Sequence, residues 1–262
     1  MKLFLLLSLI SLTATAKNVI IGHFDPFDGA QSNNSETVAK MVARRLQAQG
    51  INVKICSLQT SFQRAYPQFE ECLKDTSSLD LVIGLGETGC KLKAEFVGRN
   101  LDKTYGPDNL GVERDNTPII KGADPFLSLR YPLPQMYCAL PRDLRKKIVL
   151  SNNAGSFVCN NTAYQMRYHH PERMIGFIHV PQATCRNVAV SNTQDALIIE
   201  KMIIAGMKTT DNGVYLPHYS NSEEIPLTRR EIKTAHESVD SKCYQDFYNE
   251  IKGVDSRGLW PF

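Results

Sequence analysis

Residues 147–180 have the sequence KIVLSNNAGSFVCNNTAYQMRYHHPERMIGFIHV, and this stretch contains one complete unit of the expected fold. Residues 147–151 form a short apolar run that predicts a strand, and residues 157–168 predict a helix. Residues 174–180 form a second apolar run, which predicts another strand. Strands that alternate with helices are typical of a mostly parallel sheet covered by helices on both faces.

The same alternation continues on both sides of this stretch. One more helix is expected to be capped by Ser35 and to end at about Gln49, and another is expected over residues 194–207. The uninterrupted apolar centre of residues 79–84 is typical of a strand that is buried on both faces. Further strands are expected at residues 19–22, 52–56 and 79–84.

No internal repeat and no linker rich in proline, glycine or serine divides the chain. We therefore predict a single domain over residues 17–215, with a three-layer α/β/α structure and a twisted, mostly parallel sheet. Residues 102–134 have an irregular pattern, which suggests surface loops or a small hairpin. Residues 216–262 form a polar C-terminal extension with a possible helix at about 228–251, and no function follows from its sequence.

The first 16 residues have the parts of a secretory signal peptide. Lys2 supplies the positive end, residues 3–12 supply the apolar segment, and Ala14 and Ala16 form an A-x-A cleavage site. About ten apolar residues are too few to cross a membrane, which needs roughly 20. We therefore expect the mature chain to begin at Lys17, to be secreted or periplasmic, and to have no membrane contact after cleavage.

The composition excludes some classes of protein. Hydrophobic residues make up 42% of the 262 residues, which is enough for a full core. The 30 Lys and Arg residues nearly balance the 27 Asp and Glu residues, and the net charge is +3. Because this charge is small and is not gathered into a basic run, we do not expect a nucleic acid as partner.

The cysteine count is odd, so at least one thiol stays unpaired. Export would permit disulfides, but six cysteines can pair in 15 ways and the sequence does not choose among them. The seven cysteines are Cys56, Cys72, Cys90, Cys138, Cys159, Cys185 and Cys243.

Asn33 and Asn160 begin acceptor patterns for N-glycosylation, yet both lie in segments assigned to the active site below, so we expect them to be unmodified.

Cys159 lies at the expected start of a helix, after a strand and a glycine-containing turn. The unpaired N–H groups at a helix N-terminus favour a thiolate and can also stabilise an oxyanion. From the local sequence alone, a buried core cysteine or half of a disulfide is the more common role. His179 favours a catalytic role for Cys159, because it lies at the end of the next strand and should be on the same sheet edge. There it could act as a general base.

Glu95 is a third candidate, because a carboxylate could hold the imidazole in the required tautomer. It is expected to follow the strand at residues 79–84 by a loop, on the carboxyl edge of the sheet. Lys91, Lys93 and Arg99 surround it in the sequence. These basic sequence neighbours alone therefore indicate that Glu95 is a solvated, ion-paired glutamate.

With these residues, the chain resembles a known family, the pyrrolidone carboxyl peptidases, also called pyroglutamyl peptidase I. These cysteine peptidases remove N-terminal pyroglutamate from peptides. The resemblance covers about residues 19–207 and implies a catalytic triad of Cys159, His179 and Glu95, with no cofactor and no metal. It rests on residues 22–29 with 33–35, on residues 84–87 leading to Glu95, and on residues 151–160 and 176–181.

The resemblance also implies a pocket for the five-membered lactam ring of pyroglutamate. Phe24, Phe27 and Phe157 match the aromatic positions that enclose the ring, Asn33 matches an amide that hydrogen-bonds it, and Val158 is placed with them among the substrate-binding residues. A flat, small and uncharged ring suits aromatic faces and a few amide contacts. The chain departs from the family pattern in having no arginine in the segment Asn100–Tyr105 that follows Glu95.

The sequence allows three other interpretations. Residues 84–89 match a G-x-G-x-x-G dinucleotide pattern, but no long helix and no second strand with an acidic end follow, so we reject it. Adjacent His169 and His170 do not have the spacing of metal ligands. The remaining alternative is a secreted, non-catalytic binding protein on the same fold, which a disulfide at Cys159 would support.

Overall fold

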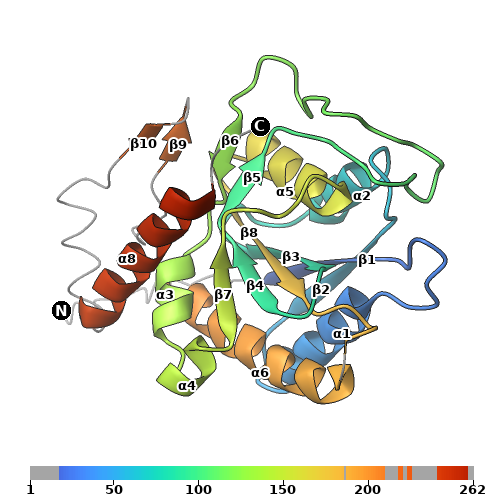
Figure 1. Ribbon diagram of the computed structural model, residues 1–262. Helices are drawn as coiled ribbons and strands as arrows, with labels where there is room; N and C mark the ends of the chain where they lie inside the picture. The colour runs from blue at the N-terminus through green and yellow to red at the C-terminus, as the bar shows by residue number, and fades with distance from the viewer. Residues whose placement is uncertain (1–17, 186, 210–217, 221–222, 226–240, 259–262) are drawn as a thin grey trace, which may run out of the picture.

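The computed structural model describes residues 18–185, 187–209, 218–220, 223–225 and 241–258. A central six-stranded sheet has the strand order β2-β1-β3-β8-β4-β7 and lies between helices on both faces (Figure 1). The three-layer α/β/α prediction is therefore confirmed. In sheet order the strands are β2 (Val53–Leu58), β1 (Val19–Phe24), β3 (Leu81–Glu87), β8 (Met174–Val180), β4 (Leu92–Glu95) and β7 (Ile148–Ser151).

The sheet is mostly parallel. Strands β2, β1, β3 and β8 all run in one direction. Strand β4 runs antiparallel to β8 and parallel to β7, so the last two strands at this edge run the opposite way. The buried strands β1 and β8 carry continuous apolar runs, as expected where helices cover both faces of a sheet.

The helices form the two outer layers. Helices α1 (Asn34–Gln47) and α6 (Val188–Met207) cover one face, and α2 (Ala65–Leu73) and α5 (Val158–His169) cover the other (Figure 1). Two short helices, α3 (Leu133–Cys138) and α4 (Arg142–Arg145), precede β7.

Several element boundaries differ from the sequence-based prediction. Asn33, not Ser35, caps α1, because its side-chain Oδ1 accepts a hydrogen bond of 2.9 Å from the Ser35 backbone N–H. Helix α6 begins at Val188, six residues before the expected start. Within the irregular stretch, β6 (Phe126–Ser128) pairs antiparallel with β5 (Val97–Arg99), which lies just before the stretch.

Part of the C-terminal extension packs against the domain. Helix α8 (Ser241–Gly258) contacts α3 and β7, and it buries Cys243, Tyr244, Phe247 and Ile251. It extends beyond the expected helix end at 251, while residues 226–240 lie outside the described residues. Strands β9 (His218–Ser220) and β10 (Glu223–Ile225) form an antiparallel pair.

The expected signal peptide, residues 1–16, also lies outside the described residues. Within the described part of the chain, no helix has the length and apolar character needed to span a membrane.

Six cysteines form three disulfides. These are Cys56–Cys72, which joins β2 to α2, Cys90–Cys185, and Cys138–Cys243, which joins α3 to α8. Cys159 is the one free thiol among the seven cysteines, all of which are described.

Candidate active site

Cys159 is the second residue of α5 and is half-buried. The first N–H groups of a helix have no partner within the helix, and here the capping residue, Phe157, makes no side-chain hydrogen bond to them. The positive end of the helix dipole and these N–H groups therefore surround the thiol. These N–H groups can stabilise a negative charge on an oxygen bound next to the sulfur.

His179 lies near the end of β8 and is only 2% exposed. Its Nδ1 lies 2.9 Å from Oε1 of Glu95. Burial by itself lowers the pKa of His179, but hydrogen bonds to Cys159 and Glu95, together with their negative charges, outweigh that effect and raise the pKa to about 9. The imidazole is thus held next to both a thiol and a carboxylate.

Glu95 ends β4 and is fully buried, so the solvated ion pair suggested by its basic sequence neighbours is not formed. It lies opposite Phe177 in the antiparallel pairing of β4 with β8, so its side chain shares a face with His179, two residues further along β8. The expectation that Glu95 follows a strand by a loop was wrong, because it belongs to a strand of its own. The hydroxyl of Tyr131 donates a 2.8 Å hydrogen bond to the Glu95 backbone carbonyl, which fixes the strand end.

Cys159 and His179 do not meet through a shared carboxyl edge of parallel strands, as was predicted. Strand β7 runs antiparallel to β8, so their carboxyl ends do not share an edge. Instead, the loop at residues 152–157 connects β7 to the start of α5 over one face of the sheet. The thiol and the imidazole still meet, both next to Gly86 of β3.

Gly86 makes this meeting possible. A Cβ atom at this position would lie 2.7 Å from Sγ of Cys159 and 3.1 Å from Cδ2 of His179. Any side chain here would therefore displace the thiol or the imidazole. In the sequence, Gly86 belongs to a dinucleotide-like pattern and to one block of the family resemblance, and neither of these predicts its close approach to the thiol and the imidazole.

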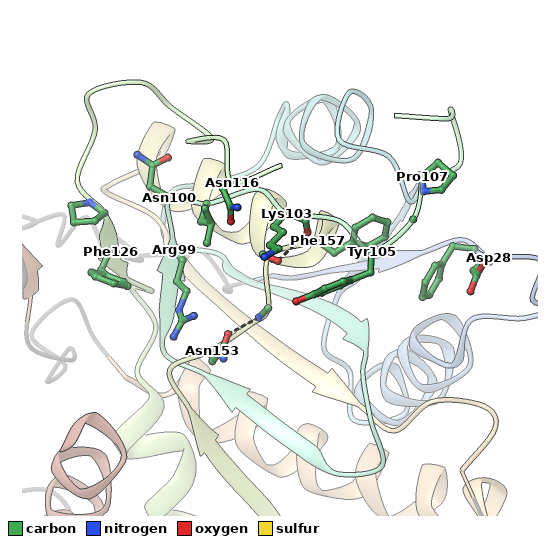
Figure 2. A pocket seen from close by; sticks show the side chains of 16 residues that line it. Asp28, Arg99, Asn100, Lys103, Tyr105, Pro107, Asn116, Phe126, Asn153 and Phe157 are labelled. Carbon is green, nitrogen blue, oxygen red and sulfur yellow. Dashed lines mark hydrogen bonds between the residues drawn. The ribbon is translucent and has the colours of Figure 1, made fainter. Parts of the chain in front are cut away.

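A pocket of about 1230 Å³ is lined in part by residues of the loop that leads from β7 into α5 (Figure 2). Cys159, His179 and Glu95 are not among its lining residues. Phe27 and Phe157 line it, with ring centroids 6.0 Å apart and ring planes tilted by 41°, and their contact with a substrate ring stays a prediction. Phe62, which the sequence analysis did not single out, packs edge-on against Phe157 at 5.3 Å and supports that wall.

The other predicted substrate-binding residues lie deeper. Phe24 packs against Phe177 with centroids 6.3 Å apart, and Phe24 and Val158 are buried. Asn33 is occupied in capping α1, and its Nδ2 donates to the Asp25 carbonyl. None of the three is among the residues that line the pocket, and their contact with substrate stays a prediction.

Two asparagines that follow Cys159 join its helix to the pocket wall. Asn160 is fully buried, accepts a hydrogen bond from the Arg99 N–H, and donates to the carbonyls of Arg99 and Leu101. Asn161 donates to both carboxylate oxygens of Asp102, at 3.0 and 2.9 Å, and burial raises the pKa of Asp102 to about 6. The glycosylation pattern and the family block that contain Asn160 in the sequence did not predict these hydrogen bonds.

The paired histidines play a packing role. His169 stacks on Tyr66, and His170 lies 3.7 Å from a carboxylate oxygen of Glu70. Over the described residues, no group of three or more His, Cys, Asp or Glu side chains is arranged to hold a metal ion.

An α/β fold that holds a free thiol against a buried histidine–carboxylate pair has the architecture of a thiol hydrolase. The family model described as pyroglutamyl peptidase matches residues 17–214, and the chain belongs to this family of cysteine hydrolases. It is therefore a peptidase.

Relatives and solved structures agree with this assignment. The chain is 32% identical over 171 residues to pyrrolidone-carboxylate peptidase of Staphylococcus carnosus (strain TM300), covering 62% of this chain and 78% of that one. It is 29% identical to pyrrolidone-carboxylate peptidase 2 of Photorhabdus laumondii, covering 80% and 95%. The pyrrolidone carboxyl peptidase structure from Thermococcus litoralis has a TM-score of 0.63 at 22% identity, covering 80% of this chain and all of that chain, which supports the fold.

Proposed function

We propose that this enzyme removes N-terminal pyroglutamate from peptides, with Cys159 as nucleophile, His179 as proton carrier and Glu95 as the group that orients His179. The observation that carries the proposal is the pairing pattern of the cysteines. Six of seven are used in disulfides, and the single thiol left free is the one beside a buried histidine–glutamate pair.

The reaction would proceed in two steps. The Cys159 thiolate attacks the pyroglutamyl carbonyl carbon, and the N–H groups at the start of α5 stabilise the oxyanion. The His179 imidazolium gives its proton to the departing amine as the C–N bond breaks, which leaves an acyl-enzyme and a shortened peptide. A water that loses a proton to His179 then attacks the thioester, which releases pyroglutamate and restores the thiolate.

Phe27 and Phe157 would hold the lactam ring between aromatic faces. Three disulfides suit an oxidising compartment, which supports the proposal that the chain is exported and acts in a secreted or periplasmic location. A disulfide at Cys159 would have favoured a binding protein without activity, and Cys159 is free.

Hydrolysis of pyroglutamyl-aminocoumarin by the purified protein tests the proposal. We expect turnover by the natural sequence, and we expect Cys159→Ala and Cys159→Ser to lose at least about 1,000-fold in kcat because the nucleophile is gone. Prolyl-aminocoumarin, which lacks the lactam carbonyl, should not be cleaved. Full activity of a Cys159→Ala protein that retains its circular dichroism spectrum would contradict the role of the thiol.

A further inference from the structure

The pocket is larger than a single pyroglutamyl ring requires. Pockets for whole drug-sized ligands commonly occupy about 300–1,000 Å³, and this one has about 1230 Å³. Asp28, which follows Phe27, lies at one end, and Arg99, Asn100 and Phe126 lie at the other (Figure 2). If the ring lies between Phe27 and Phe157, the end near Arg99 is open to the peptide that follows it.

Arg99 lacks an anionic partner. Its side chain is half-buried, its Nε makes no hydrogen bond, and no carboxylate of the described residues lies within ion-pairing distance of it. Burial lowers the pKa of Arg99, although the negative charge of Glu95 acts in the opposite direction. A guanidinium that is partly removed from water and left unpaired is unfavourable, and an anion from a bound ligand would relieve that cost.

The backbone of Arg99 is fixed next to the nucleophile. Asn160, which follows Cys159 directly, binds both the N–H and the carbonyl of Arg99, at 2.9 Å each. Arg99 thus lines the pocket, and its backbone is held by the residue that follows the proposed nucleophile. A substrate whose scissile carbonyl contacts Cys159 would place its next residues within reach of this side chain.

The charges along the pocket are unequally distributed. Lys103 lies between the two ends, and its ammonium is 5.8 Å from the ring centre of Tyr105. Arg99 and Lys103 are the cationic residues among those lining the pocket, and Asp28, at the far end, is the acidic one. The end beyond the ring is therefore positive.

We propose that Arg99, assisted by Lys103, binds a carboxylate on the leaving side of the scissile bond. This inference rests on the proposed function, since it names the substrate class of the same site. The carboxylate can come from an acidic residue directly after pyroglutamate or from the free C-terminus of a dipeptide. A guanidinium pairs with a carboxylate through two parallel N–H···O bonds, a geometry that a neutral amide does not match.

The test compares kcat/KM for four substrates: pyroglutamyl-glutamate amide, pyroglutamyl-glutamine amide, pyroglutamyl-alanine amide and pyroglutamyl-alanine with a free carboxylate. We expect the natural enzyme to prefer the glutamate over the glutamine substrate by about 10-fold or more. If the C-terminal carboxylate is the source, the preference appears instead between the two alanine substrates. Raising the salt to about 0.5 M should weaken the preference.

Variants assign the preference to particular residues. Arg99→Gln should abolish it and Lys103→Gln should reduce it, while Lys201→Gln, an exposed cation on α6 across the sheet, should retain it. Equal rates for charged and neutral substrates in the natural enzyme would overturn the inference. So would an Arg99→Gln variant that slows both equally, because Arg99 would then act through Glu95. Absence of turnover with every substrate would instead overturn the proposed function, and the inference with it.

Discussion

At the residue scale, the proposed mechanism depends on one imidazole in an unusual environment. His179 is buried, which disfavours its charged form, yet Cys159 and Glu95 together hold its pKa at about 9. At neutral pH the ring is therefore an imidazolium that can protonate a leaving amine. Glu95 is the partner on the Nδ1 side, and its second carboxylate oxygen, Oε2, makes no hydrogen bond within the described residues.

The pH dependence of kcat/KM should show this directly, since it reports the ionisation of the free enzyme. The imidazolium loses its proton as the pH rises through about 9, so the rate should fall above that pH. Glu95→Gln removes a charge that stabilises the imidazolium, so it should move this alkaline limb to lower pH. An alkaline limb that stays in place in Glu95→Gln would show that Glu95 does not govern this ionisation.

Gly86 offers a second test at this scale. The methyl group of Gly86→Ala would lie 2.7 Å from Sγ of Cys159, which no packed structure tolerates, so the thiol must move. Displacing a reacting group by about 1 Å can cost about 100-fold in rate, and we expect a loss of kcat of that order. The matched control is Gly22→Ala in β1, which meets the Phe69 ring at the same 2.7 Å but touches neither the thiol nor the imidazole.

The control variant should lose stability while its folded fraction keeps its kcat. Thermal melting followed by circular dichroism and steady-state rates on both variants separate the two effects. Unchanged kcat in a folded Gly86→Ala protein would contradict the geometry of the site.

At the scale of elements, the apolar runs and their spacing predicted most of the strands of the sheet. They did not predict that the two strands at one edge, β4 and β7, run antiparallel to the others. The strands at residues 19–22, 79–84 and 174–180 were found because buried parallel strands are continuously apolar. The direction of β7 depends on its pairing with β4, a four-residue strand far away in the sequence that local patterns do not reveal. Cys159 and His179 were singled out from local order, whereas Glu95 was assigned its role only through the family resemblance.

The asparagine that joins α5 to β5 gives the prediction at this scale. Asn160→Ala removes three hydrogen bonds and leaves the Arg99 N–H and the Leu101 carbonyl unpaired, whereas the Arg99 carbonyl still accepts from the Leu101 N–H. Each buried group left unpaired costs about 1–3 kcal/mol, so the free energy of unfolding should fall by at least about 2 kcal/mol. Because the same bonds fix the pocket wall next to Cys159, KM should rise as well.

Urea unfolding and steady-state kinetics measure both quantities. Asn52→Ala, which removes one exposed hydrogen bond to Asn18, is the control and should change neither by much. Asn160→Ala with the stability and KM of the natural protein would show that α5 and the wall are held together in another way.

At the scale of the whole molecule, three disulfides use six of the seven cysteines and leave free Cys159, the proposed nucleophile. The bonds at Cys56–Cys72, Cys90–Cys185 and Cys138–Cys243 join separate parts of the chain, and the last holds α8 of the C-terminal extension to α3. Closing loops of this length stabilises a fold by about 2–4 kcal/mol each. The sequence could not predict the pairing, since it depends on which cysteines meet in space, but its odd count required at least one free thiol.

The most direct test of this account is alkylation of the folded protein by iodoacetamide without reducing agent, followed over time by mass spectrometry and by turnover of pyroglutamyl-aminocoumarin. We predict that a single carbamidomethyl group is added, that it maps to Cys159, and that activity falls in proportion to its addition. Activity that survives complete alkylation of Cys159, or a label that maps to another cysteine while activity is lost, would contradict the assignment of this thiol as the nucleophile.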